Sequence, residues 1–131
     1  MILVDTSVWI EFLEGDKHWT KERLKRRIAD RETIAYVDMI FLEIIQGVRE
    51  RSDREDLHLK FQSFVDLSVK RSTIMLAAEI YQDLQRKGIR IRSIIDCLVA
   101  SVAIETGAVL LHKDRDFDHI AKYYPIIIEK P

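Results

Sequence analysis

The chain has 131 residues, of which 47% are hydrophobic and 33% are charged, and its formal net charge is −1 at pH 7. This length suits one domain with its own hydrophobic core, spanning residues 1–131, and the composition excludes a disordered or fibrous protein. No apolar run approaches the roughly 20 residues that a membrane-spanning helix needs, and the balanced charge gives no overall signature of a nucleic-acid-binding protein.

The start of the chain and its cysteine content indicate the compartment. Met1 leads directly into an apolar, strand-like segment, without the basic region and small-residue cleavage site of a signal peptide. Cys97 is the one cysteine in the sequence, so it cannot form a disulfide within the chain, which fits a reducing environment. We therefore expect a cytoplasmic protein.

The first residues predict a strand that leads into a helix. Residues 2–4 are aliphatic without interruption, which is typical of a short strand buried on both faces. Asp5, Thr6 and Ser7 then supply turn and capping groups for a helix that carries Trp9. Asp5 could serve only as the helix cap, but acids elsewhere in the chain favour a functional role for it, with Thr6 and Ser7 as the capping residues.

The rest of the chain alternates between helical and strand-like patterns, and Glu14, Gly15 and Asp16 end the first helix. Helices are expected over residues 18–30, after a cap at Asp38, after a cap at Ser52, over 72–87, from residue 94 to Gly107, and over 116–122. Strands are expected over residues 33–37, 67–69, 108–111 and 126–128. This alternation predicts a single α/β domain with a mostly parallel central sheet flanked by helices.

Five acidic residues occupy places that a parallel sheet would bring together. Asp5 follows the first strand, and Asp114 and Asp116 follow the strand at 108–111. Asp96 begins the helix before that strand, and Glu43 lies in an apolar helix, on what we expect to be a buried surface. Since the carboxyl ends of parallel strands meet at one edge of a sheet, these side chains are expected in one cleft.

Carboxylates gathered in one cleft repel each other unless cations neutralise them. Mg²⁺ suits such a group, because it prefers oxygen ligands and keeps waters for a phosphate-bearing substrate. The chemistry that fits is phosphodiester hydrolysis, in which a metal lowers the pKa of a bound water. Other sites fit less well: the histidines and Cys97 lack metal-ligand spacing, and Ser7 lies in no G-x-S-x-G turn.

The ordered set of these motifs resembles a PIN domain, and in order and spacing it is most similar to the VapC toxins of bacterial and archaeal toxin–antitoxin pairs. The resemblance is carried by Asp5-Thr6-Ser7, by Glu43 with Gly47 one turn later, by Asp96 at the start of an apolar helix, and by residues 111–117, Leu-His-Lys-Asp-Arg-Asp-Phe. It covers essentially the whole chain. The sequence departs from the pattern at Asp38 and His112, where relatives often have Thr.

The resemblance implies a three-layer fold and a ribonuclease that depends on Mg²⁺ or Mn²⁺. It implies an acidic quartet of Asp5, Glu43, Asp96 and Asp114, with Asp116 as a further acid near the metal. On this basis we expect Asp5 and Asp96 to be the principal metal ligands, Asp114 and Asp116 to complete or share the metal shell, and Glu43 to hold a metal-bound water. Thr6 corresponds to a hydroxyl residue that could bind such a water.

The resemblance also implies partners. These are an RNA substrate, such as a transfer RNA, a second copy of the chain in a homodimer, and a VapB-like antitoxin that fills the active-site groove. The basic residues that could contact RNA phosphates are Lys21, Arg23, Lys25, Arg26, Arg27, Arg90, Arg92, Lys113 and Arg115.

Two other readings stay open. A catalytically silent PIN-like module could bind RNA or protein, although such a module has no need for mutually repelling carboxylates. A phosphatase or receiver-type domain also places acids at strand ends, but the first strand here lacks the paired acids of that class.

The apolar residues Ile74, Ala77, Ala78 and Tyr81 could equally belong to the core or to a dimer interface.

Overall fold

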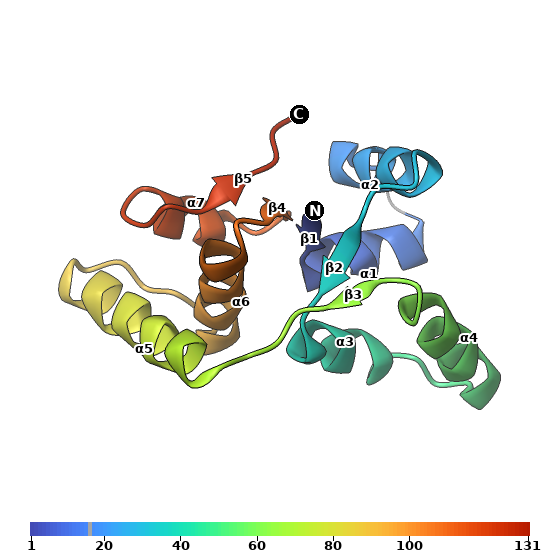
Figure 1. Ribbon diagram of the computed structural model, residues 1–131, viewed down its shortest axis with the longest axis horizontal. Helices are drawn as coiled ribbons and strands as arrows, with labels where there is room; N and C mark the ends of the chain where they lie inside the picture. Colours follow the sequence, from blue (N-terminus) through green and yellow to red (C-terminus); the bar gives the residue numbers. More distant parts are fainter. Residues whose placement is uncertain (16) are drawn as a thin grey trace.

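The computed structural model describes residues 1–15 and 17–131 and contains a five-stranded sheet in the order β3-β2-β1-β4-β5 (Figure 1). The strands are β1 (Ile2–Val4), β2 (Ile34–Tyr36), β3 (Val65–Asp66), β4 (Val109–Leu111) and β5 (Ile127–Ile128). Each neighbouring pair is parallel. Asp16, expected in the break after the first helix, lies outside the described residues.

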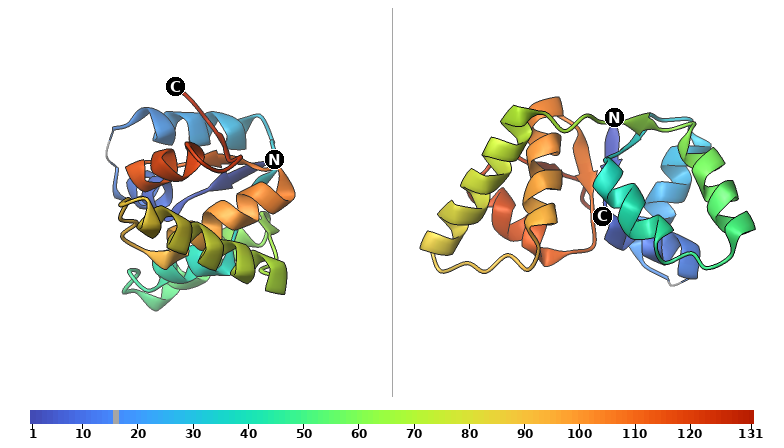
Figure 2. Two further views of the ribbon diagram at one scale, coloured as in Figure 1. Left: turned by 90° about the vertical axis from the view of Figure 1, so that its left-hand side faces the viewer. Right: turned by 90° about the horizontal axis from the view of Figure 1, so that it is seen from below.

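The helices cover both faces of this sheet, as Figures 1 and 2 show. On one side lie α1 (Thr6–Glu14), α2 (Trp19–Ala29), α3 (Asp38–Ile45) and α4 (Arg51–Phe61). On the other lie α5 (Arg71–Arg86), α6 (Ile94–Thr106) and α7 (Arg115–Ala121). The expected three-layer α/β fold is therefore confirmed. Among the described residues, no helix is long and apolar enough to cross a membrane.

Strand β1 occupies the middle of the sheet because its three side chains are apolar and buried. Its register with β4 pairs Val4 with Leu111, so the residues after both strands leave the sheet side by side. The backbone N–H of Asp5 extends this pairing by donating to the carbonyl of Leu111 at 3.0 Å. The start of α1 and the loop after β4 are thereby fixed next to each other at the carboxyl edge of the sheet.

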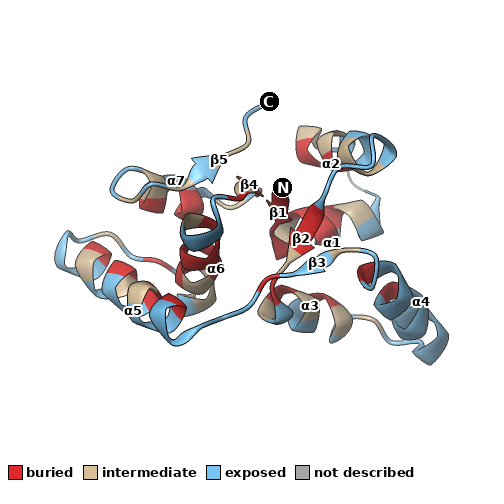
Figure 3. Ribbon diagram, viewed as in Figure 1, coloured by how far each residue is buried: buried red, intermediate tan, exposed pale blue. Residues whose placement is uncertain are grey.

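Buried side chains gather in the sheet and on the inner sides of the helices, whereas α4 and α5 have exposed outer surfaces (Figure 3). Trp9 packs on the rings of Phe12, Phe61 and Phe64 and joins α1 to the segment around α4. Helix α6 is buried through much of its length because small residues let it approach its neighbours closely, and Cys97 is part of this apolar surface.

Helix α5 carries the four apolar residues that could belong either to the core or to a dimer interface, and it places them on different sides. Ala77 is buried, as are Thr73, Ile80 and Leu84, so this face belongs to the core against α6. Ile74 is exposed on the opposite side. The four residues singled out in the sequence therefore do not form one surface.

The structure corrects three details of the predicted elements. Asp38 is the first residue of α3 and not its cap, which is Val37. Helix α4 follows Glu50, which makes no capping hydrogen bond, and so begins before Ser52. The strand expected at 67–69 is β3, at Val65–Asp66, because the register with β2 pairs Ala35 with Val65.

Candidate active site

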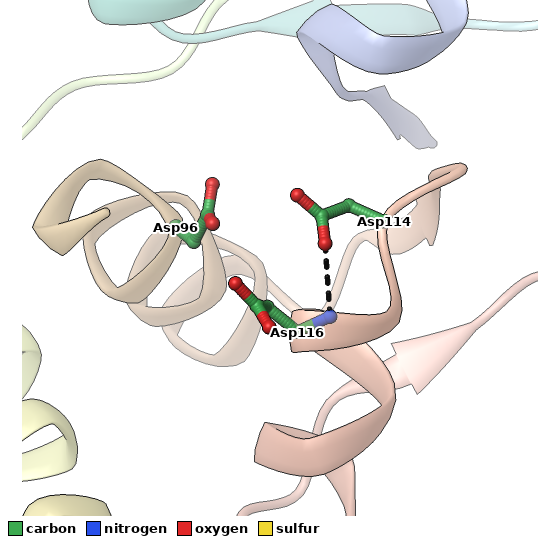
Figure 4. Close-up of side chains that lie close together, drawn as sticks. All are labelled: Asp96, Asp114 and Asp116. Carbon is green, nitrogen blue, oxygen red and sulfur yellow. Dashed lines mark hydrogen bonds between the residues drawn. The ribbon is translucent and has the colours of Figure 1, made fainter. Parts of the chain in front are cut away.

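Three of the five predicted acids form a tight cluster. Asp96, Asp114 and Asp116 each offer a carboxylate oxygen that lies within 4.8 Å of those of the other two. Figure 4 shows Asp96 approaching from α6 and the other two from the start of α7. The structure thus brings together residues that are distant in sequence, as the predicted topology requires.

Local structure fixes the two acids of α7. Asp114 is the N-cap of this helix, and its Oδ1 accepts the backbone N–H of Asp116 at 3.0 Å (Figure 4). Capping by a short acidic side chain satisfies a free amide in the first turn and suits the positive end of the helix dipole. One short motif therefore both starts the helix and aims its two carboxylates at Asp96.

Asp5 lies beside this cluster and is itself the cap of α1, so the expected capping by Thr6 and Ser7 is wrong. Its Oδ2 accepts hydrogen bonds from the Ser7 backbone N–H at 3.1 Å and from Ser7 Oγ at 2.6 Å. Ser7 Oγ also accepts the backbone N–H of Lys113 at 3.0 Å. Capping and a place at the acidic site are therefore compatible roles for Asp5.

Glu43 reaches the site from α3, but it is exposed, contrary to the expectation of a carboxylate on a buried surface. The core-facing residues of α3 are Ile40 and Ile44. Thr6 Oγ1 donates a hydrogen bond to Glu43 Oε1 at 3.2 Å, which ties the glutamate to the residue after Asp5. Glu43 thus flanks the site and does not belong to the three-residue cluster.

Burial shifts Asp5, Glu43 and Asp96 toward their neutral forms, and like charges add to the shift of Glu43 and Asp96. The pKa of Asp96 is raised from 3.8 to about 7, mainly by burial and also by the charges of Asp5, Asp114, Asp116 and Glu43. Burial also raises the pKa of Asp5, against the hydrogen bonds from Ser7 that lower it. Although Glu43 is exposed as a residue, partial burial of its carboxyl group and the charge of Asp5 raise its pKa, against the hydrogen bond from Thr6 that lowers it. All five acids therefore share one electrostatic environment.

His112 organises the loop after β4. The ring is buried, and its Nδ1 accepts the backbone N–H of Asp114 at 3.0 Å. Burial lowers the pKa of His112, although Asp118 lies 3.4 Å from Nε2. A neutral ring that accepts at Nδ1 carries its proton on Nε2, toward Asp118.

An ion pair between a buried acid and an exposed lysine, close to the site, was not predicted from the sequence. Glu11 on α1 is only 4% exposed, and it pairs with Nζ of Lys113 and accepts a hydrogen bond from Thr20 Oγ1 at 3.3 Å. The sequence predicts Lys113 as a phosphate contact. The pair instead anchors the loop that carries Asp114 to α1 and α2. The available signal in the sequence was an acid between apolar residues of the first helix, because an acid that becomes buried requires a partner.

Arg92 also has a role that the sequence did not reveal. The sequence predicts a phosphate contact, yet the Arg92 guanidinium donates to Asp114 at 2.8 Å and to Asp116 at 3.3 Å. Its backbone N–H donates to Asp116 at 3.1 Å. The acidic cluster therefore contains one permanent positive charge from the chain itself.

Three of the seven other basic candidates form ion pairs among the described residues. Arg23 and Arg27 both contact Glu129 near the C-terminus, and Lys25 lies 3.5 Å from Glu22. Arg26, Arg90 and Arg115 are exposed, and none of them forms an ion pair with another residue in the described parts of the chain. These three arginines are therefore the candidates most available for an external anion.

The donor set fits a divalent cation. Opposite ligands of Mg²⁺ are about 4.2 Å apart, twice its usual bond length, so oxygens within 4.8 Å need only small adjustments. The carboxylate of Asp96 accepts no hydrogen bond from any described residue, which leaves both of its oxygens for a ligand. A cation would also relieve the repulsion that raises its pKa.

Comparison with known proteins agrees with this geometry. The family model described as "PIN domain" matches residues 2–123. The chain belongs to the PIN-domain family. Two similar proteins are "Ribonuclease VapC11" of Mycobacterium tuberculosis and "VapC ribonuclease Mb1587" of Mycobacterium bovis. Each is 34% identical over 124 residues, covering 93% of this PIN-domain chain and 92% of the relative. The resemblance stated from the sequence is thereby confirmed.

Solved structures share the PIN fold. The VapBC2 complex of Rickettsia felis, bound to a promoter DNA fragment, matches with a TM-score of 0.76 at 19% identity, covering 98% of both chains. VapC20 of Mycobacterium tuberculosis, described as a sarcin-ricin loop cleaving toxin, matches with a TM-score of 0.66 at 20% identity, covering 95% of this chain and 96% of that one. At such identities the matches support the fold alone.

Proposed function

We propose that this PIN domain is the toxin of a type II toxin–antitoxin pair and acts as an Mg²⁺- or Mn²⁺-dependent endoribonuclease. The observation that carries the proposal is the convergence of five acids at the carboxyl edge of the sheet, in a chain whose 34% identical relatives are ribonucleases. The tight cluster of three supplies the oxygen ligands, and the nearby pair supplies further negative charge.

Each residue has a distinct part in the proposed site. Asp96, Asp114 and Asp116 would hold the cation, with Asp5 beside them as a further ligand and Glu43 oriented by Thr6 to hold a water. The bound ion would supply an acidified water and neutralise charge on the scissile phosphate. Asp5 as a principal ligand, inferred from the resemblance, remains part of this proposal.

Positioning residues keep these groups in place without touching the substrate. Ser7 bridges Asp5 to the Lys113 backbone, and His112 holds the Asp114 N–H. Because these contacts join the end of β1 to the loop after β4, the acids from the two segments are held in a fixed relation. Such preorganisation favours metal binding in one geometry.

The direct test is cleavage of structured RNA by the purified protein. A transfer RNA pool and a stem–loop with the sarcin-ricin sequence are incubated with the protein in Mg²⁺, in Mn²⁺ and in EDTA. We expect fragments only with metal, and losses of at least a hundredfold in rate for Asp96→Asn and Asp5→Asn. Asp56→Asn, an exposed acid on α4, is the matched control prepared in the same way.

Two results would count against the proposal. Cleavage that survives both EDTA and Asp96→Asn would exclude the proposed metal mechanism. RNA binding without cleavage in any metal would instead favour the catalytically silent module.

We propose a VapB-like antitoxin as the protein partner, since several fold neighbours are VapBC complexes. Coexpression with the product of an adjacent small gene should yield a complex that no longer cleaves RNA. The homodimer is likewise a prediction, for which Ile74 and Met75 offer exposed apolar side chains on α5. Sedimentation of the chain alone tests it, and a monomer at all concentrations would reject it.

A further inference from the structure

Arg92 brings a positive charge to the two carboxylates that would bind the metal. Its Nη2 lies 2.8 Å from Asp114 Oδ1, and its Nε lies 3.3 Å from Asp116 Oδ2. These hydrogen bonds hold one oxygen of each acid. A cation that binds Asp114 and Asp116 would therefore come close to a guanidinium of the same sign.

The guanidinium can leave while its backbone stays. The Arg92 side chain is 64% exposed, whereas that of Asp116 is 4% exposed. The backbone N–H of Arg92 donates to the same Oδ2 of Asp116 at 3.1 Å and does not depend on the side-chain rotamer. Withdrawal of the side chain would thus leave Asp116 oriented.

This redundancy decides which of two opposing effects is larger. A guanidinium can help metal binding by orienting carboxylates, or hinder it by repelling the cation. Here Asp116 keeps its backbone contact, and Asp114 is held as the cap of α7 by the N–H of Asp116. Since both carboxylates stay oriented without the guanidinium, its main effect on metal binding is the repulsion between its charge and that of the cation.

We propose that Arg92 competes with the divalent metal for Asp114 and Asp116, and that an RNA phosphate draws it away. The second half rests on the proposed ribonuclease function. A phosphate is a good alternative partner for an arginine fork. RNA that binds Arg92 would then raise the affinity for metal, and by linkage metal would raise the affinity for RNA.

The first experiment measures metal affinity without RNA. Mn²⁺ is titrated calorimetrically into the wild type, Arg92→Ala, Arg92→Lys and Arg90→Ala, after circular dichroism has checked that each is folded. We expect Arg92→Ala to bind Mn²⁺ about tenfold more tightly than the wild type, because a nearby like charge has been removed. Arg92→Lys, which keeps the charge, should stay within about threefold of the wild type.

Arg90→Ala is the matched control for net charge. Arg90 is exposed two residues before Arg92 and forms no ion pair within the described residues, so its loss should change the affinity less than twofold. Weaker Mn²⁺ binding by Arg92→Ala would overturn the proposal and assign Arg92 to orientation of the carboxylates. Equal affinities of Arg92→Ala and the wild type would overturn it as well.

The second experiment measures coupling to RNA. The affinity for a structured RNA is compared in EDTA and in Ca²⁺, with electrophoresis to verify that the RNA stays intact. We expect Ca²⁺ to strengthen RNA binding several-fold more in the wild type than in Arg92→Ala. Equal strengthening would refute the coupling. Absence of RNA binding by the wild type would refute the proposed function and the coupling. The Mn²⁺ titrations would then still show whether Arg92 competes with the metal for Asp114 and Asp116.

Discussion

Replacing Asp96 by Asn should stabilise the metal-free protein while removing its activity. Asp96 has a pKa of about 7 in the folded chain, raised from 3.8 first by burial and then by neighbouring carboxylates. Above pH 7 the folded protein therefore carries an ionised group in an environment that disfavours it. Asparagine has nearly the same shape and cannot ionise, so the variant does not have this cost.

The sign and size follow from the two pKa values. Between pH 3.8 and about 7 the folded state binds a proton that the unfolded state has lost, so stability falls as the pH rises through this range. A difference of about three pH units corresponds to at most about 4 kcal/mol, at 1.36 kcal/mol for each. Burial of a polar amide offsets part of this, so we expect a gain of about 1–3 kcal/mol at pH 8.

Thermal unfolding in EDTA measures the effect. For a chain of this size, about 1–3 kcal/mol corresponds to an increase in Tm of roughly 3–12 °C at pH 8. At pH 4, where Asp96 is protonated in the wild type, the two proteins should unfold within about 2 °C of each other. Asp56→Asn on the exposed surface of α4 should show no such pH-dependent difference.

Metal reverses the order of stability. Mg²⁺, which we propose binds the folded wild type, should raise its Tm, whereas Asp96→Asn should respond little because one proposed ligand is lost. The reasoning would be refuted if Asp96→Asn were less stable than the wild type at pH 8 in EDTA. It would also be refuted if the difference in Tm were the same at pH 4 and pH 8.

Three further substitutions test the surroundings of the site. Ser7→Ala removes a donor to Asp5 and an acceptor for the Lys113 N–H, and should lower stability by about 1–2 kcal/mol in urea unfolding and weaken Mn²⁺ binding in calorimetry. Lys113→Met leaves the buried Glu11 without its cation and should cost about 2–4 kcal/mol in the same unfolding assay. Gly107→Ala places a side chain at φ +71° and should lower the Tm with an unfolding cost of about 1 kcal/mol, while RNA cleavage at 25 °C is unchanged.

Order along the chain was sufficient to predict the architecture. The aliphatic triplet at 2–4 and the run at 108–111 have the composition of strands buried on both faces, and both are central strands in the sheet. Acids directly after such strands must lie at the carboxyl edge, whatever the side-chain details. This is why the sequence was enough to gather Asp5 and Asp114.

Helix α3 shows where periodicity fails. The helix carries apolar side chains of its own on nearly all sides, so the sequence does not distinguish its buried face from its exposed face. Leu42 is 58% exposed, and its neighbour Glu43 lies on the solvent side as well. The burial of a residue on such a helix depends on how the helix packs, which is a tertiary property.

Contacts between distant residues could not be predicted either. Arg92 meets Asp114 and Asp116 only because α6 and α7 converge, and Lys113 meets Glu11 only because β4 lies next to β1. The sequence also does not show which of several adjacent capping residues begins a helix. Asp5, Thr6 and Ser7 can each cap a helix, and the backbone conformation of Asp5 decides among them.

The place of β4 beside β1 also sets a condition on synthesis. A nascent chain presents Asp5 and Glu43 early, but it lacks Asp114 and Asp116 until the segment with β4 and α7 has been translated. The central strand must then accept β4 as a late neighbour before the three-carboxylate cluster can form. A ribosome-bound fragment that stops before Val109 therefore cannot assemble the metal site, and the proposed nuclease stays inactive during most of its own translation.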